Sequence, residues 1–394
     1  MAHTYLIINI GSSSKKYTLL REGVRVYDAH FERSKDQYIL TERGTEVHPA
    51  EEIPPAVFER SLEHVLLEVE DVLGEASGVD AVLMRVVALG AFFQKHALID
   101  ASYKSALSQV ERLDPIHISP VLDELDRVSS LGLDIPIYAI SDSAFHQTLP
   151  EVARRYALPR SVADTYDFFR FGYHGISVAS AVRMTAETMG YMPERMIVCH
   201  LGSGASITAV RKGESIDTSM GYSPLEGLLM STRSGDIDPA IVMRLAREQG
   251  IEKTETMLYR DSGLKGLSER SDDMKALLEQ SAGDLHARET VDAFVYRAQK
   301  YIGAYYAVLD GLDALVFTGT MGERSTPIRA KIASGLMNMG ILLDVGKNSF
   351  ESTDQCRAIH YEMHTPVYVV HSDEATEMAR ITDGLIGASI IETK

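Results

Sequence analysis

The chain has 394 residues, more than one compact core usually contains, so we expect two domains. Its formal net charge of −17 argues against a surface for nucleic acid or anionic membranes, because phosphate backbones bind clustered Lys and Arg. With 2 cysteines a disulfide framework is implausible, and no apolar run is long enough to span a membrane. The N-terminus lacks a basic segment followed by an apolar one, so we expect a cytoplasmic protein.

The hydrophobic pattern of the first half predicts an α/β domain. Its predicted elements are a hairpin of strands 5–9 and 16–20, a helix at 55–73, a strand at 81–87, a helix at 119–129 and a strand at 135–140. The last of these strands leads directly into Asp142. Open α/β sheets carry their chemistry at the carboxyl ends of the strands, which makes Asp142 a candidate site residue.

The second half repeats this scheme. Its predicted elements are strands at 196–200 and 207–210, helices around 238–249 and 288–309, strands at 314–318 and 367–370, and a closing helix that ends near residue 388. We expect an N-terminal α/β domain of residues 1–145, joined by the C-terminal helix 377–394, and a C-terminal domain of residues 146–376 that binds nucleotide or phosphate. No low-complexity linker separates the halves, which favours closely apposed lobes with a central cleft.

Three buried strands each run into a loop of small residues. The loops are 11–14, 202–206 and 319–322. Such loops expose backbone N–H groups, which bind phosphate oxygens well. Any one of them could be only a tight turn between a strand and a helix. Three of them, spread over both halves, indicate a duplicated α/β protein that binds a polyphosphate.

Five motifs carry a resemblance to a known family. They are Asn9-Ile-Gly-Ser-Ser-Ser14 and the segments 142–148, 171–175, 200–206 and 217–239. Together, and in this order, they resemble the acetate kinase family of kinases that form acyl phosphates, from residue 5 to about residue 380. The segment 217–239 is the most specific, because it crowds Gly, Ser, Thr and Asp around one arginine, as ordered polar loops do.

The resemblance implies a fold and an activity. The implied fold is the duplicated α/β fold of the sugar kinase, Hsp70 and actin superfamily, which is ribonuclease H-like, with two domains and a central cleft. The implied activity is reversible phosphoryl transfer from ATP to a short carboxylate such as acetate, giving acetyl phosphate and ADP. The resemblance also implies Mg²⁺, with Mn²⁺ as a substitute, and a homodimer.

A carboxylate nucleophile determines what such a site must supply. A short fatty acid has a pKa of about 4–5, so at neutral pH it is already ionised and needs no general base. The site must instead align two anions that repel each other and neutralise the transferring phosphoryl group. Guanidinium groups fork onto carboxylate and phosphoryl oxygens, and Arg85 and Arg233 occupy the family's matching positions. Losing one such contact is expected to cost about 3 kcal/mol or more of barrier.

Two further residues complete the predicted catalytic set. Asp142 follows its strand, and His174 matches the family histidine that hydrogen-bonds the phosphoryl group. Glycines flank the motif that contains His174, which leaves its ring accessible. The alternatives are a surface ion pair for either arginine, a structural role for His174 and a structural cap for Asp142.

The resemblance also implies a substrate pocket, with Arg85 and His117 on the carboxylate side. Val87, Ile116 and Pro224 match the family's small apolar pocket for the alkyl tail, although a single Val or Ile is usually plain core.

Asn9, Asp142 and Glu374 match the positions associated with magnesium. Mg²⁺ commonly binds through few carboxylates, with water and phosphate oxygens as its other ligands. A structural cap is the alternative for Glu374 too.

For the nucleotide and its phosphates, the matching positions lie in both halves of the chain. They are Ser12, Lys16, His200, Gly202, Ser203, Gly204, Asp273, Met274, Lys275, Gly319, Thr320 and Gly322.

The sequence departs from the family at both ends of the expected site. Where the family usually has His-Arg-Val-Val-His-Gly-Gly, this chain has Met84-Arg-Val-Val-Ala-Leu-Gly90, and Ile118 replaces an expected Asn. On the nucleotide side, the β-branched Thr320 stands where the backbone should approach the nucleoside. Lys275 replaces an Arg and cannot make the same planar contact.

These departures leave alternatives open for the reaction. They are pyrophosphate in place of ATP, propionate or butyrate in place of acetate, and a catalytically silent relative that binds nucleotide. The retained arginine pair argues against the silent relative. Separately, His360 and His364 are four residues apart and would suit a metal if helical, but no third ligand is evident.

Overall fold

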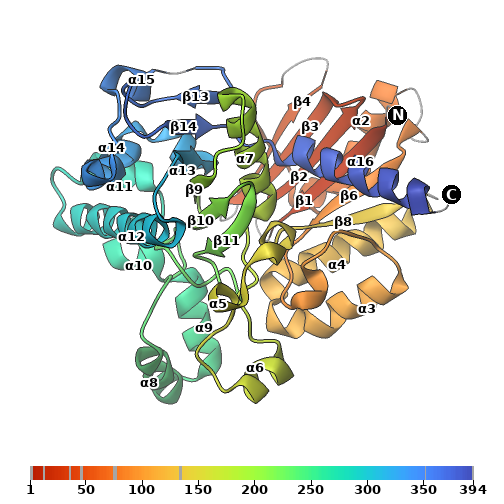
Figure 1. The fold of residues 1–394 in the computed structure, drawn as a ribbon. Coiled ribbons are helices and arrows are strands. Elements are labelled where there is room, and N and C mark those ends of the chain that lie inside the picture. The colour runs from red at the N-terminus through yellow and green to blue at the C-terminus, as the bar shows by residue number, and fades with distance from the viewer. Residues whose placement is uncertain are drawn as a thin grey trace. The chain divides into compact units, whose positions relative to one another are not determined.

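The computed structural model describes residues 3–11, 14–34, 37–44, 48–73, 78–132, 135–350 and 352–392. The chain divides into two compact units (Figure 1). The first unit contains Met1–Ala144 and Asp373–Lys394, and the second contains Phe145–Ser372.

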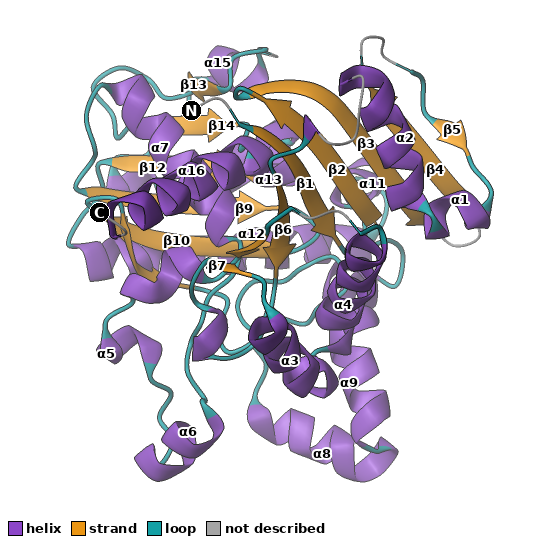
Figure 2. Ribbon diagram, turned by 90° about the vertical axis from the view of Figure 1, so that its right-hand side faces the viewer, coloured by secondary structure: helices purple, strands orange, loops and turns teal. Residues whose placement is uncertain are grey.

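The first unit is built on an eight-stranded sheet in the order β5-β4-β3-β2-β1-β6-β8-β7, most of which can be followed in Figure 2. Its strands are β1 (Thr4–Ile10), β2 (Ser14–Arg21), β3 (Val24–Ser34), β4 (Gln37–Arg43), β5 (Glu51–Glu52), β6 (Ala81–Val86), β7 (Ala97–Leu98) and β8 (Ile137–Ser141). β1 pairs antiparallel with β2, as the predicted hairpin requires, and parallel with β6, which pairs parallel with β8. The carboxyl ends of β1, β6 and β8 therefore meet at one edge of the sheet.

Five α-helices of the described residues belong to this unit. They are α1 (Pro55–Glu59), α2 (Ser61–Leu73), α3 (Ala101–Val110), α4 (Pro115–Ser130) and α16 (Glu374–Glu392). The helix predicted at 55–73 is broken at Arg60, which caps α1. The helix predicted at 119–129 begins earlier, because Pro115 occupies its first turn and Pro120 lies within it.

The second unit has a six-stranded sheet in the order β11-β10-β9-β12-β14-β13. Its strands are β9 (Arg195–Leu201), β10 (Ala205–Arg211), β11 (Glu214–Thr218), β12 (Ala314–Thr318), β13 (Cys356–Ala358) and β14 (Val367–Val370). β9 pairs antiparallel with β10 and parallel with β12, which pairs parallel with β14. This repeats the pattern of β2, β1, β6 and β8, so the predicted duplicated α/β fold is confirmed.

The second unit also contains helices, and several of them contact its sheet. The helices are α5 (Glu151–Arg154), α6 (Arg160–Tyr166), α7 (Gly175–Met189), α8 (Pro239–Gln249), α9 (Ile251–Arg260), α10 (Gly263–Ser268), α11 (Met274–Gln280), α12 (Leu285–Leu309), α13 (Gly319–Arg324), α14 (Thr326–Ser334) and α15 (Val345–Ser349). α7 and α12 both contact β9. Met196 and Val198 of β9 share a core cluster with Val178 and Val182 of α7. The side chains between them, such as Ile197, point to the opposite face, because successive residues of a strand alternate.

Among the described helices, none is both long and apolar enough to cross a membrane.

Candidate active site

In the first unit, four predicted site residues form one hydrogen-bonded chain. Arg85, near the end of β6, donates from Nε and Nη2 to the two carboxylate oxygens of Asp142, at 3.2 and 3.0 Å. Its Nη1 donates to Asn9 Oδ1 at 3.2 Å, and Asn9 Nδ2 donates to Glu374 Oε2 at 3.1 Å. The carboxyl ends of three parallel strands and the first residue of α16 thus bring together one cation, one amide and two carboxylates.

Burial determines the electrostatics of this cluster. Asp142 is only 1% exposed, so its charge has lost most of its hydration and is balanced by Arg85. Burial alone would lower the pKa of Arg85, but the charges of Asp142 and Glu374 raise it above its usual value. The guanidinium therefore stays charged at every pH at which the protein is folded.

The same cluster offers the ligand chemistry that a hard cation needs. Asp142, Glu374 and Asn9 supply carboxylate and amide oxygens, which suit Mg²⁺. Within the described residues there is no group of three His, Cys, Asp or Glu side chains that could hold a metal by themselves. A cation bound here would therefore need ligands beyond two carboxylates, such as the Asn9 amide, water and phosphate oxygens.

The other predicted residues of the first unit take different positions. Lys16 on β2 pairs across the strands with Asn9, and its side chain is exposed. His117 lies in the first turn of α4, where its Nδ1 contacts both oxygens of Asp114 at 2.8 and 3.0 Å. Val87 is half-buried just after β6. Ile116 is part of α4, but its side chain lies outside what is described, as does the whole of Ser12.

A histidine that the sequence did not indicate supports the strand that leads to Asp142. His96 Nδ1 accepts a hydrogen bond from the backbone N–H of Ser141 at 3.1 Å, so this nitrogen must carry no proton. Burial lowers the pKa of His96 from 6.5 to about 4. The unfolded chain therefore takes up a proton first as the pH falls.

We accordingly expect His96 to make stability depend on pH. Its contribution is complete above about pH 6.5 and is lost progressively as the pH falls towards 4. Thermal unfolding of the wild type and of His96→Gln, measured at pH 7 and pH 5, should show a smaller drop for the variant. Equal drops would mean that the folded protein does not hold His96 neutral.

In the second unit, His174 occupies a constrained position. Its φ is +61°, in the left-handed region that non-glycine residues seldom adopt. Its Nδ1 lies 3.0 Å from Ser206 Oγ, and its ring stacks on that of His200 with centroids 4.1 Å apart. Gly172 cannot be replaced here, because a Cβ on it would lie 2.6 Å from the ring of His146.

The loop after β9 brings Gly204 close to the side chains of both His174 and Arg233. The point at which a Cβ of Gly204 would lie is 3.1 Å from His174 Nε2 and 3.7 Å from Arg233 Nη1. The loop is held to the segment of Arg233, because Ser231 N donates to Ser203 O at 3.0 Å. Arg233 Nη1 also donates to the carbonyl oxygen of Pro224 at 2.9 Å. Two side chains that can donate hydrogen bonds to an anion therefore lie next to the same loop residue.

The other predicted residues near this loop take different positions. His200 Nδ1 lies 2.8 Å from Ser177 Oγ, and a Cβ on Gly202 would lie 3.7 Å from His200 Nε2. Ser203 is exposed, whereas Pro224 is buried.

The third loop lies next to the second, at the end of β12. Gly319 has a φ of +76°, and a Cβ on it would lie 2.8 Å from Leu201 O, so only glycine fits between the two strands. Gly322 is buried, and a Cβ on it would lie 3.6 Å from Cys199 O. Thr320 is exposed in the first turn of α13.

The predicted segment 273–275 forms the start of α11. Asp273 accepts hydrogen bonds from the backbone N–H groups of Lys275 and Ala276 and so caps the helix. Met274 is 4% exposed and packs inward, which leaves only its backbone for a ligand, while Lys275 is exposed.

Two results bear on residues outside the predicted set. Ser206, which contacts His174, is a fully buried hydroxyl residue of β10, as is Thr208, and its place in the motif 200–206 could have indicated it. The helical spacing that would let His360 and His364 bind a metal is absent, because 362–364 form a turn and His360 Nδ1 accepts from Val367 N at 3.1 Å.

Comparison with known proteins places this site in a family. Residues 4–380 match the sequence model of the Acetokinase family. The chain is 38% identical to an acetate kinase of Dictyoglomus turgidum, over 98% of both chains. It is 39% identical to an acetate kinase of Streptomyces coelicolor, over 98% of this chain and 97% of the relative.

Solved structures agree with the sequence comparison. An acetate kinase of Porphyromonas gingivalis matches with a TM-score of 0.86 at 29% identity, over 98% of this chain and 100% of that one. A propionate kinase from Francisella tularensis matches with a TM-score of 0.87 at 30% identity, over 96% and 98%. The chain therefore belongs to the acetokinase family, whose members are kinases that transfer a phosphoryl group to a carboxyl group.

Proposed function

We propose that this protein is an acetate kinase that converts acetate and ATP into acetyl phosphate and ADP, reversibly and with Mg²⁺. The observation that carries the proposal is the convergence of His174 and Arg233, two hydrogen-bond donors, on the loop at Gly204. Similarity to acetate kinases over nearly the whole chain supports acetate as the acceptor and ATP as the donor.

The chemistry requires little proton transfer. Acetate is ionised at neutral pH, so its oxygen attacks the γ-phosphorus directly. The new C–O–P linkage forms as the bond from the γ-phosphorus to the β,γ-bridging oxygen breaks, and the electron pair of that bond leaves with ADP. In this scheme Arg233 and His174 donate to the oxygens of the phosphoryl group, and Arg85 binds the acetate carboxylate.

Asn9, Asp142 and Glu374 would hold the magnesium ion. Bound with the nucleotide, Mg²⁺ supplies positive charge that offsets the phosphate oxygens. Arg85 already balances the charge of Asp142 and so keeps that carboxylate in place for metal binding. His117 is proposed to lie on the acetate side, with Val87, Ile116 and Pro224 around the methyl group.

For the nucleotide, we propose the loops after β9 and β12 together with the start of α11. The exposed Thr320 in the first turn of α13 favours pyrophosphate as a second candidate donor, because its branched side chain takes up room near the proposed nucleoside side.

We also propose a cytoplasmic homodimer. α8, whose residues are all described, buries no side chain and exposes Ile241 and Met243, which supports association through this helix. Light scattering of the purified protein tests the dimer.

A hydroxamate trap for acyl phosphate tests the activity. ATP and pyrophosphate are each supplied with acetate, propionate or butyrate. We expect the highest rate with ATP and acetate. A higher rate with pyrophosphate would identify pyrophosphate as the donor, and a higher rate with propionate or butyrate would identify that acid as the acceptor. If no combination gives product, the protein is a relative that binds nucleotide without catalysis.

A further inference from the structure

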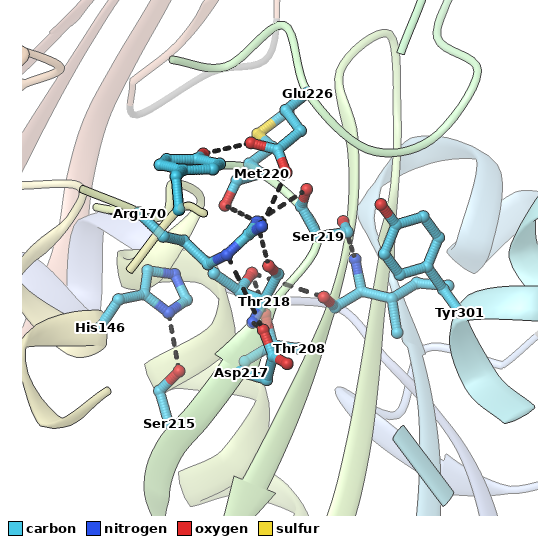
Figure 3. A network of polar contacts seen from close by, with 12 residues as sticks. His146, Arg170, Thr208, Ser215, Asp217, Thr218, Ser219, Met220, Glu226 and Tyr301 are labelled. Atoms are coloured by element: carbon cyan, nitrogen blue, oxygen red, sulfur yellow. Dashed lines mark hydrogen bonds and ion pairs between the residues drawn. The ribbon is translucent and has the colours of Figure 1, made fainter. Parts of the chain in front are cut away.

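Arg170 lies between α6 and the turn that contains His174, and its side chain makes an unusually dense set of contacts (Figure 3). Its Nη1 donates to the carbonyl oxygens of Thr218, Ser219 and Met220, at 2.9, 3.4 and 3.3 Å. Its Nη2 donates to Glu226 Oε1 at 2.7 Å. One guanidinium thus contacts the chain at two places that are only six residues apart in sequence.

These two places are the ends of the short turn 220–226. Glu226 is fixed further by Tyr156, whose hydroxyl donates to Glu226 Oε2 and accepts from Tyr222 N at 2.8 Å. A Cβ on Gly221 would lie 1.7 Å from Glu226 Oε2, so the carboxylate packs directly against the backbone of the turn. Arg170 therefore holds the two ends of the turn together, by hydrogen bonds to Met220 O at one end and to the Glu226 carboxylate at the other.

The turn carries the carbonyl group that contacts Arg233. Pro224 O lies within it and accepts from Arg233 Nη1 at 2.9 Å. The segment on the far side of Glu226 is anchored separately, because Asp236 accepts from Gly227 N at 2.9 Å and from Tyr301 Oη at 2.7 Å. If the turn 220–226 moved, Pro224 O would move with it, whereas the contacts of Asp236 would hold the segment after Glu226 in place.

The charges involved are poorly hydrated, which makes the pair hard to replace. The side chains of Arg170 and Glu226 are 16% and 29% exposed. Burial opposes the charge of Arg170, but the carboxylate of Glu226 raises its pKa above the usual value. Removing Arg170 would leave Glu226 as a partly buried carboxylate without its cation, together with three carbonyl groups that lose their donor.

We propose that Arg170 is a positioning residue for phosphoryl transfer, which closes the turn 220–226 onto Glu226 and thereby fixes the orientation of the Arg233 guanidinium through Pro224 O. This inference rests on the proposed role of Arg233. Arg170 acts through the turn and touches neither substrate, and a small displacement of an aligned group is enough to slow a reaction substantially.

Steady-state kinetics of Arg170→Lys provide the first test. Lysine keeps the charge but cannot fork onto Glu226 and three carbonyl oxygens at once. We expect kcat to fall about 10- to 100-fold, while the KM for ATP changes little. The matched control is Arg195→Lys, since Arg195 in the same unit pairs with Asp313 and donates to the carbonyl of Asp310. The control should keep the wild-type kcat, and an unchanged kcat in Arg170→Lys would overturn the proposal.

A double-mutant cycle tests whether Arg170 acts through Arg233. In an Arg233→Lys background, whose residual rate remains measurable, adding Arg170→Lys should lower kcat by less than about twofold. An equal fold-loss in both backgrounds would mean that Arg170 acts independently of Arg233, and would overturn the proposal.

Hydrogen exchange separates failure of this inference from failure of the proposed function. In Arg170→Lys, amides of residues 221–226 should exchange faster than in the wild type, whether or not the wild type turns over acetate. Amides at 214–216, in the part of β11 that Arg170 does not contact, should be unchanged. Unchanged exchange at 221–226 would show that Arg170 does not hold the turn.

Discussion

Replacing Arg233 with alanine should lower kcat by about a hundred- to a thousandfold, the usual effect of removing one preorganised donor to a developing charge. Arg233 Nη1 lies 3.7 Å from the point where a Cβ of Gly204 would be, beside His174. In the transition state the phosphoryl oxygens need positive charge there, and an alanine supplies none. Steady-state assay of acetyl phosphate formation measures the loss.

The circular dichroism spectrum and the melting temperature show whether this loss is catalytic. Arg233 is only half-buried, so its removal should leave the fold intact. A folded variant with the wild-type rate would exclude Arg233 from the mechanism.

A methyl group at Gly204 should abolish most activity without unfolding the protein. Gly204 does not have a positive φ, so alanine fits its backbone. Its Cβ would, however, stand 3.1 Å from His174 Nε2 and 3.3 Å from Cε1, next to the side chains that we propose to bind the phosphoryl group. We expect Gly204→Ala to lower kcat/KM for ATP at least about a hundredfold, because the group can no longer be aligned.

Gly283→Ala is the matched control for this change. Gly283 lies in the same unit, and a Cβ on it would meet nothing within 4 Å. The control should behave as wild type in both assay and melting temperature. Full activity in Gly204→Ala would mean that phosphate binds elsewhere.

The strands were predictable where burial is complete on both faces. The apolar runs of β1, β6, β9, β12 and β14 have nearly every side chain buried, and each was expected within a few residues of its position. β3, by contrast, mixes Arg25, Asp28 and Glu32 with apolar residues, and no strand was predicted there. Its place next to β2 comes from tertiary pairing.

Helix boundaries depended on local details that periodicity does not contain. Pro120 suggested a helix start, yet it lies inside α4, which begins at Pro115 after Asp114. The side chain of Asp114 does not cap the helix and binds His117 instead. The apolar periodicity also continues across Arg60 and so predicted one helix, whereas the structure has α1 ending at Glu59 and α2 beginning at Ser61.

The candidate site was identified by residue type, whereas its contacts were not predictable. Motifs indicated Arg85 and Asp142, but the fork between them joins residues 57 apart in sequence, and no local pattern encodes it. Arg170 is a clearer case. A single arginine beside a motif can have many different partners, so the sequence does not indicate which ones it contacts. Only the folded structure shows that Arg170 contacts both ends of the turn 220–226.

The contact between Asn9 and Glu374 has a consequence for biosynthesis. β1 cannot make its contacts with α16 until that helix has been translated, since Asn9 Nδ2 donates to Glu374 Oε2, and Tyr5 Oη donates to Asp383 Oδ1 at 2.6 Å. The stretch from Phe145 to Ser372 is continuous, so it can fold before α16 has been translated. The proposed metal ligands Asn9 and Glu374 therefore come together only after synthesis of the whole second unit.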